Sequence, residues 1–92
     1  MTPHNSVEWD EAKRLKAIRK HGIDFAEAIK VFEGPHALLP ARRDTEARFM
    51  AVGPLNGMVV AVIFTIRPDA LRIITVRRAR PDERRQYQAL HA

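Results

Sequence analysis

Residues 56–66, Asn-Gly-Met-Val-Val-Ala-Val-Ile-Phe-Thr-Ile, carry the clearest structural signal in this chain. The Asn-Gly pair is the strongest short signal for a two-residue hairpin turn, because such a turn requires positive φ angles that these two residues tolerate. The nine residues after it are almost all apolar and mostly β-branched, which is typical of strands. The stretch therefore predicts a central strand, Met58–Ile66, that is covered on both faces.

Weaker strand patterns flank this one. Residues 48–52 alternate loosely and predict the strand that enters the hairpin, and Ala37-Leu38-Leu39 reads as a short strand before it. After Pro68-Asp69, residues 71–77 predict a strand whose alternation puts Leu71, Ile73 and Thr75 on one face and Arg72, Ile74 and Val76 on the other. We therefore expect an antiparallel sheet of three to four strands. Residues 7–9 fit either a short edge strand or a turn that packs Trp9 on the core.

Two helices are expected before the sheet. Asp10 is a good N-cap for a helix over Glu11–His21, which Gly22 ends. Ala12, Leu15 and Ile18 form its apolar stripe, and a separate basic stripe consists of Lys13, Lys16 and Lys20. The second helix begins with a capping box of Asp24 and Glu27 and ends at Gly34-Pro35. Its apolar face consists of Phe25, Ala28, Ile29 and Phe32.

A third helix is expected at the C-terminal end, from Pro81 to about Leu90, with Asp82 and Glu83 in its first turn. This order of elements predicts an α+β fold. The length of 92 residues suits one domain, residues 1–92, with residues 1–6 as a loose leader. The pattern leaves open whether the closing helix packs on the core or meets a partner.

Composition excludes several classes of protein. There is no cysteine, so disulfide scaffolds and cysteine nucleophiles are excluded, and Ser6 is the only serine. The four histidines (4, 21, 36 and 91) lack ligand-like spacing, which predicts no metal site, and the common nucleotide-binding motifs are missing, so no cofactor is expected. The longest apolar run, Met58–Phe64, is too short to span a membrane, and no secretory signal precedes the first helix. We expect a cytoplasmic protein without membrane contact.

Charge is the most informative part of the composition. The chain carries a formal charge of +5, and from Arg48 onward eight arginines and no lysine oppose three acidic residues. Arginine pairs with phosphate through a planar fork, so an arginine-rich domain of this size points to phosphate-rich or acidic partners. A basic, solvated surface without a specific partner is the alternative.

Several charged residues are candidates for a site. His21 ends the first helix, where the residues by themselves favour a capping role; the helix dipole also favours its protonated form and would keep it available as a proton donor. Glu46 and Arg48 lie two apart on one face of a strand, either as a surface ion pair or as a base beside a phosphate clamp. The further candidates for phosphate contacts are the arginines near the ends of the last two strands: Arg67, Arg72, Arg77 and Arg78.

In order and spacing, these segments resemble the BrnT-type toxins of bacterial type II toxin–antitoxin systems. The matching text is V-E-W-D-E-A-K at 7–13, K-H-G-I-D-F-A-E-A at 20–28, V-F at 31–32, E-A-R-F at 46–49, V-G at 52–53 and R-I-I-T-V-R-R-A-R-P-D-E-R-R-Q-Y at 72–87. The resemblance implies a RelE-like fold, metal-independent cleavage of RNA, and a hetero-oligomer with a BrnA-like antitoxin. That partner would carry a ribbon-helix-helix domain and be the only link to DNA.

The resemblance also implies where the site lies. It points to Lys20 and His21, to Glu46 and Arg48, and to Arg72 and Arg77 of the last strand. Our hypothesis assigns Glu46 as the base or as the group that orients Lys20, His21 as the acid, and Arg48 and Arg77 as phosphate clamps, with Lys16, Arg67, Arg72 and Arg78 as further contacts to RNA.

This sequence departs from the family pattern in two places. Thr75 and Val76 replace a Ser-Ala pair, and residues 41–45 read Ala-Arg-Arg-Asp-Thr where the family often has an acidic stretch. Val76 is bulkier than alanine and could alter the surface. Two alternatives therefore stay open: a non-enzymatic module that binds RNA or an acidic partner, and a degenerate toxin that retains only antitoxin binding.

Overall fold

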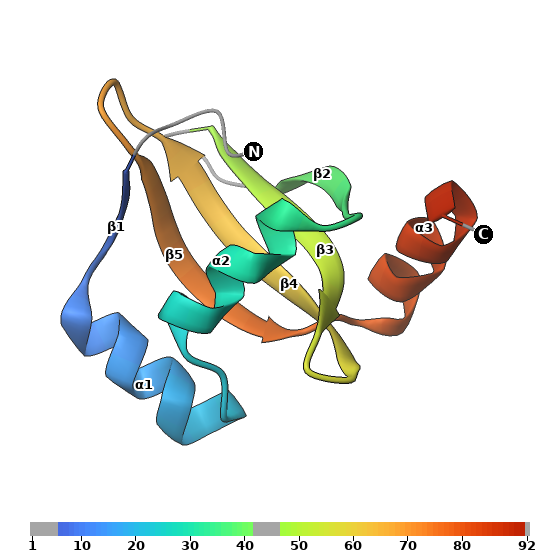
Figure 1. Ribbon diagram of the computed structural model, residues 1–92, viewed down its shortest axis with the longest axis horizontal. Coiled ribbons are helices and arrows are strands. Elements are labelled where there is room, and N and C mark those ends of the chain that lie inside the picture. The colour runs from blue at the N-terminus through green and yellow to red at the C-terminus, as the bar shows by residue number, and fades with distance from the viewer. Residues whose placement is uncertain (1–5, 42–46, 92) are drawn as a thin grey trace.

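The computed structural model describes residues 6–41 and 47–91 and contains one sheet with the strand order β1-β5-β4-β3-β2 (Figure 1). Its strands are β1 (Val7–Trp9), β2 (Ala37–Ala41), β3 (Arg48–Leu55), β4 (Met58–Ile66) and β5 (Leu71–Arg78). The strands β2 to β5 form the antiparallel meander that the sequence predicts. The α+β class is thus confirmed, but the described sheet has five strands rather than three to four.

The additional strand is β1, which pairs in parallel with β5 and makes the sheet mixed. A three-residue strand has too few residues to show an alternating pattern, so its sequence fits a turn equally well. Ser6, which we expected to belong to a loose leader, is also held: its Oγ donates to the Asp69 carbonyl at 2.8 Å, and its carbonyl accepts from the Leu71 N–H at 3.0 Å. Residues 1–5 lie outside the described residues.

The central position of β4 is confirmed. It lies third in the sheet, and Val60, Ala61 and Val62 are fully buried, so both of its faces are covered there. The hairpin from β3 turns at Asn56 and Gly57, whose φ angles of 50° and 84° are the positive values that the Asn-Gly signal predicts.

A register shift interrupts the pairing of β4 with β5. Ile63 pairs with Thr75, but its neighbour Phe64 pairs with Ile73, so Ile74 is an extra residue on β5. Such a bulge reverses the alternation beyond it. Ile73 and Val76 therefore both belong to the core on one face, which corrects the strict alternation expected for this strand.

The three helices occupy three different positions around the sheet. They are α1 (Glu11–His21), α2 (Phe25–Glu33) and α3 (Pro81–His91), close to the predicted bounds. In Figure 1, α2 lies across one face, α1 lies beside the β5 edge, and α3 stands apart beyond β2 and β3. None of the helices in the described ranges is both long enough and apolar enough to cross a membrane.

The main core lies between α2 and the sheet. Phe25, Ala28 and Phe32 are buried there as predicted, joined by Val31, and Trp9 contacts Phe25 edge to face at 6.1 Å between ring centroids. Asp24 caps α2 as expected by accepting from the Ala26 N–H at 3.0 Å. The core holds α2 in a fixed position against the sheet.

The packing of α1 differs from the prediction. The helix buries Ala17, whereas Ala12 is exposed and Leu15 retains 42% of its accessible surface. The side that turns inward contains Arg14, which bonds to Glu11 at 2.6 Å and to Asp24 at 3.1 Å. This ion-paired arginine occupies the place that the sequence pattern assigns to apolar side chains.

The contact of β3 with the start of β2 leaves no room for a side chain at Gly53. A Cβ atom there would lie 3.0 Å from the Pro35 carbonyl oxygen and 3.1 Å from atoms of Val31 and His36. We expect Gly53→Ala to lower the free energy of unfolding by about 1–3 kcal/mol, because the tight backbone contact must move. Urea unfolding followed by circular dichroism measures the change.

Gly34→Ala is the matched control. A Cβ atom at Gly34 would meet no atom within 4 Å, and its φ of −115° suits any residue. This variant should be as stable as the wild type, or slightly more stable because its unfolded chain is less flexible. Equal stability of the two variants would contradict the close contact at Gly53.

Candidate functional site

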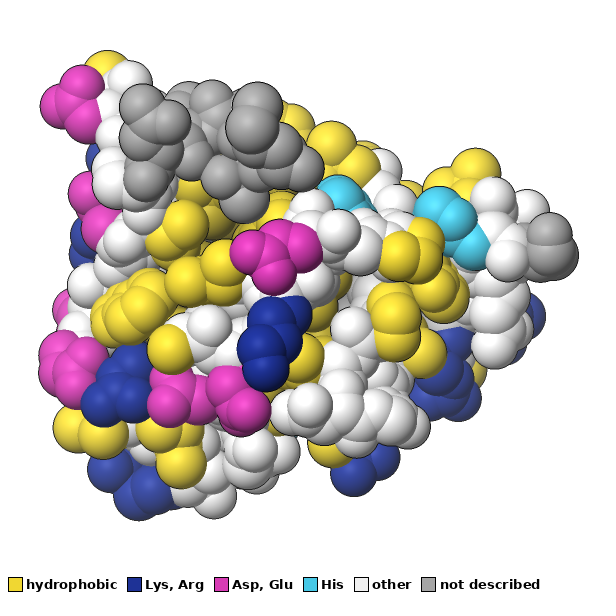
Figure 2. Space-filling view, viewed as in Figure 1, with side chains coloured by type: hydrophobic (Ala, Val, Ile, Leu, Met, Phe, Trp, Pro, Cys, Tyr) yellow, Lys and Arg dark blue, Asp and Glu magenta, His cyan; other side chains and the backbone are white. Residues whose placement is uncertain are grey.

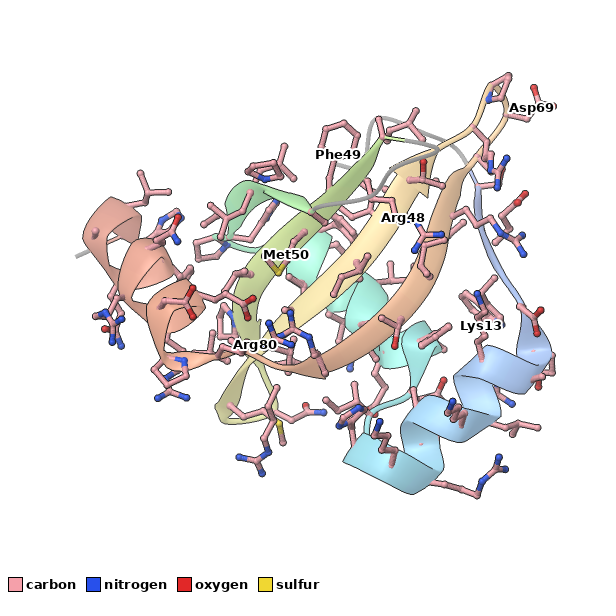
Figure 3. All side chains as sticks on the ribbon, turned by 180° about the vertical axis from the view of Figure 1, so that it is seen from behind. Lys13, Arg48, Phe49, Met50, Asp69 and Arg80 are labelled. Carbon is pink, nitrogen blue, oxygen red and sulfur yellow. The ribbon has the colours of Figure 1, made fainter. Side chains whose placement is uncertain are left out.

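A groove crosses the sheet face that α2 leaves open. It consists of two adjoining cavities of about 290 and 380 Å³ that share Arg48, Ile74 and Thr75. The first cavity is lined also by Lys13, Lys16, Ala17, Lys20 and His21, and the second by Pro40, Ala41, Met50, Ile63, Arg77, Arg80 and Glu83. Figure 3 looks onto this face. Lys13 of α1 lies toward one end of the groove and Arg80 toward the other, with Arg48 and Met50 between them.

The groove concentrates the positive charge of the chain. Its lining contains six lysine and arginine side chains and one carboxylate, so it carries as much net charge as the +5 of the whole protein. Elsewhere the basic and acidic residues balance. On the side shown in Figure 2, lysines and arginines are scattered among hydrophobic and acidic side chains. The groove is therefore a specific place for a polyanion.

The helix α1 forms the basic wall of the first cavity. Lys13, Lys16 and Lys20 follow helical spacing, and buried Ala17 between them lets the helix approach β5 closely. The basic stripe predicted from the sequence thus faces the sheet groove. Three ammonium groups along one wall can contact several phosphates of a polyanion.

His21 lies where this wall ends. The helix cap is made by Gly22, whose N–H bonds to the Ile18 carbonyl at 2.9 Å, so capping does not need the imidazole. Partial burial lowers the pKa of His21 below its ordinary value, and the nearby charges of Lys20 and Arg77 lower it further. The net lowering favours the neutral form of His21 over the protonated form that the helix dipole favours, and the donor role expected from the sequence stays a prediction.

Arg77 and Glu83 form an ion pair in the floor of the second cavity. The guanidinium bonds to both carboxylate oxygens of Glu83, at 2.8 and 3.0 Å, and the Glu83 side chain is only 7% exposed. One of these oxygens also accepts from the backbone N–H of Arg80 at 2.8 Å. The arginine lowers the pKa of Glu83, so this carboxylate stays ionised and attaches the start of α3 to β5.

The sequence analysis assigned no site role to Glu83. The residue stands three positions after Arg80, which is the spacing of a capping box, and that signal could have marked it as bound to the helix start. Its contact with Arg77 of β5 has no local sequence signal, because five residues separate the two and they belong to different elements.

Arg48 and Thr75 lie where the two cavities meet. Arg48 points to the groove while its neighbour Phe49 packs on the main core, as the strand alternation predicts. Val76, the departure from the family pattern, is fully buried on the opposite face and does not touch the groove. Glu46, the predicted base, lies outside the described residues, as do residues 42–45.

Three predicted phosphate contacts are not part of the groove. Arg72 bonds to Glu8 of β1 at 2.8 Å. Arg78 pairs in register with Val60, whose side chain is in the main core, so strand alternation separates it from Arg77. Arg67 lies in the turn between β4 and β5, where its N–H bonds to the Ala70 carbonyl. Of the predicted residues, the structure gathers Lys16, Lys20, His21, Arg48 and Arg77.

The groove combines cations with a neutral imidazole. Cations stabilise a phosphate and any extra charge that it gains, and a neutral imidazole accepts a proton. Among residues 6–41 and 47–91, no three histidine, aspartate or glutamate side chains gather in a way that would hold a metal ion.

The ion pair of Arg77 with Glu83 should make stability depend on pH. We expect Glu83→Gln to lower the free energy of unfolding at pH 7 by about 1–3 kcal/mol, because a largely buried guanidinium loses its charged partner. The pKa of Glu83 is lowered from 4.5 in the folded state, so its contribution is full above pH 4.5 and fades as the pH falls below it. Urea unfolding at neutral and acidic pH should show the two proteins converging.

Glu8→Gln is the control for this substitution. It also breaks a carboxylate–arginine contact of 2.8 Å, but its side chain is 47% exposed. The change should therefore be within about 1 kcal/mol. Equal effects of the two substitutions would contradict the special role of the Glu83 contact.

The chain was compared with known proteins. The model of a family described as the ribonuclease toxin BrnT of type II toxin–antitoxin systems matches residues 9–83. The 1.1 Å crystal structure of the Brucella abortus ribonuclease toxin BrnT is 38% identical, with a TM-score of 0.66 over 82% of this chain and 96% of that one. No match was found among curated proteins. The family match and the identity together show that the chain belongs to the BrnT family of ribonuclease toxins of type II toxin–antitoxin systems.

Proposed function

We propose that this protein binds single-stranded RNA in the basic groove and cleaves it without a metal ion, by attack of a 2′-hydroxyl on the neighbouring phosphate. The observation that carries the proposal is the groove itself, which holds the net positive charge of the chain and a neutral His21 in one place. The 2′-hydroxyl serves as the nucleophile, so the protein needs no serine or cysteine of its own.

Phosphate binding and charge stabilisation have candidate groups in the groove. The phosphate enters between the α1 wall and Arg48, whose planar fork can bond to two of its oxygens. The lysines hold the flanking phosphates, and Lys20 adds charge beside the reacting one. As negative charge builds on phosphorus, these fixed cations stabilise it more than they stabilise the ground state.

In this proposal His21 accepts the proton of the 2′-hydroxyl as the new O–P bond forms, and the 5′-oxygen that leaves phosphorus takes up a proton from water. A general base must be unprotonated, and the lowered pKa of His21 makes the neutral form the main one near pH 7. This reverses the acid role of our sequence-based hypothesis. The function of Glu46 in proton transfer stays a prediction, because that residue lies outside the described part of the chain.

The biological setting follows from the family. A type II system pairs its toxin with a protein antitoxin, and we propose that a ribbon-helix-helix antitoxin of the BrnA type neutralises this chain in the cytoplasm and supplies the only contact with DNA. Cleavage of RNA would inhibit translation and growth when the antitoxin is absent. The open face of the groove offers an anionic segment of such a partner a place to block RNA.

The first test is cleavage of naked RNA by the purified protein in the presence of EDTA. We expect the wild type to cut and Arg48→Lys to be slower by about 10²-fold, because lysine retains the charge but loses the two-pronged contact. The matched control is Arg72→Lys, since Arg72 bonds to Glu8 outside the groove and should tolerate the same exchange.

The assay also separates the alternative functions. RNA binding without cutting by the wild type, with stronger binding by Glu46→Gln, would favour a non-enzymatic binder over a ribonuclease. Cutting that stops in EDTA would refute the metal-independent mechanism. Equal losses in Arg48→Lys and Arg72→Lys would remove Arg48 from its assigned place.

The role of His21 predicts the shape of the pH profile. If neutral His21 accepts the proton, single-turnover cleavage should rise with pH through an inflection below 6.5, the ordinary pKa of histidine, and then level off. His21→Ala should lower the plateau rate by about 10²–10⁴-fold and remove this rise. A rate that falls with increasing pH over the same range would assign His21 as the acid instead.

A further inference from the structure

The two cavities of the groove differ in chemistry. The cavity beside α1 is walled mainly by three lysines, whereas the cavity beside α3 combines an apolar wall of Pro40, Ala41, Met50 and Ile63 with the charged side chains of Arg48, Arg77, Arg80 and Glu83. Met50 belongs to the small core beneath α3 and is 8% exposed, so this wall is held in place by packing. A phosphate gains nothing from apolar walls, whereas a flat aromatic base does.

The size of the second cavity suits a ring system. Its volume is about 380 Å³. An apolar cavity of about 150 Å³ in another protein binds benzene, so a cavity more than twice as large has room for a nucleobase.

Among the polar side chains of this cavity, Arg77 has nearly all of its donors engaged. All four N–H groups of its two terminal nitrogens are engaged: two with Glu83, one with the Arg78 carbonyl at 3.2 Å, and one with the Met50 sulfur at 3.8 Å. The guanidinium therefore cannot form a two-pronged bond to phosphate without losing Glu83. What it still offers the cavity is its Nε–H and the flat face of the guanidinium.

A flat, fixed guanidinium is a surface on which bases stack in RNA complexes. Glu83 holds this one by two bonds, and the Met50 side chain that lines the same cavity touches its edge. Arg80, on the rim and exposed, places a positive charge beside the cavity where a neighbouring phosphate would lie.

We infer that the cavity beside α3 is a base-binding subsite, in which one nucleobase next to the cleaved phosphate stacks on the face of Arg77 and against Met50. The inference rests on the proposed function, because it assumes that RNA lies along the groove. Arg77 is then a binding platform instead of the phosphate clamp expected from the sequence, and Glu83 is a positioning residue that keeps the platform flat.

The experiment measures binding of 2′-O-methyl trinucleotides, which cannot be cleaved because the attacking hydroxyl is blocked. The complete trinucleotide is compared with three modified trinucleotides, each of which lacks the base at one position. We expect the wild type to lose about 5- to 150-fold in affinity when the base is missing at one position, and little at the other two. Fluorescence anisotropy at low salt gives the dissociation constants.

Protein variants test whether this loss of affinity arises in the cavity beside α3. Arg77→Lys retains the charge without the plane, and Met50→Ala shortens the apolar wall, so both should bring the effect of the missing base to within about threefold. Ile63→Ala repeats the wall test should Met50→Ala fail to fold. The control, Lys16→Ala, lies in the other cavity and should weaken binding of all four trinucleotides alike, because it removes a phosphate contact.

Two results would overturn the inference. One is equal binding of all four trinucleotides by the wild type. The cavity would then bind no base, and a side chain of a protein partner would be its expected occupant. The other is a base effect that survives in Arg77→Lys and in both wall variants. Cleavage of unmodified RNA, measured in parallel, separates the two proposals: cutting without a base effect refutes only the subsite, and a base effect without cutting refutes only the ribonuclease.

Discussion

The extra residue that β5 carries opposite β4 determines which side chains reach the groove. Before the bulge, Leu71 and Ile73 face the helices, and uninterrupted alternation would send Arg77 to the same side. The bulge at Ile74 reverses this order, so Val76 enters the core and Arg77 points to the open face. A bulge is a local change of the backbone, yet here it moves a charge from one side of the sheet to the other.

Once Arg77 is on that face, its contact with Glu83 organises the rest of the site. The pair attaches α3 to the sheet, encloses the second cavity, and occupies the donors of the arginine. The other cations of the lining remain directed at the groove, opposite a neutral imidazole. A polyanion therefore meets two different surfaces along one groove: a row of lysines, and a cavity that combines an apolar wall with charged side chains.

Local signals were sufficient for most of the elements. The Asn56-Gly57 turn, the Asp10 and Asp24 caps and the apolar run of β4 each act within a few residues, and the structure confirms all of them. Predictions failed where distant residues decide. The strand β1 forms only because β5 is available as a partner, and the inward side of α1 contains Arg14, whose contact with Asp24 has no signal in the pattern of α1.

The α+β class, the bounds of the helices, the central strand and the excess of arginine could all be predicted from the amino-acid sequence, because they depend on backbone propensity and composition. The family could be predicted from the order and spacing of its motifs. That Lys16, Lys20, His21, Arg48 and Arg77 share one groove while Arg67, Arg72 and Arg78 do not is visible only in the folded chain. The physical reason is that the direction of a side chain in a sheet depends on register, and register is set by pairing and packing with strands that are distant in the sequence.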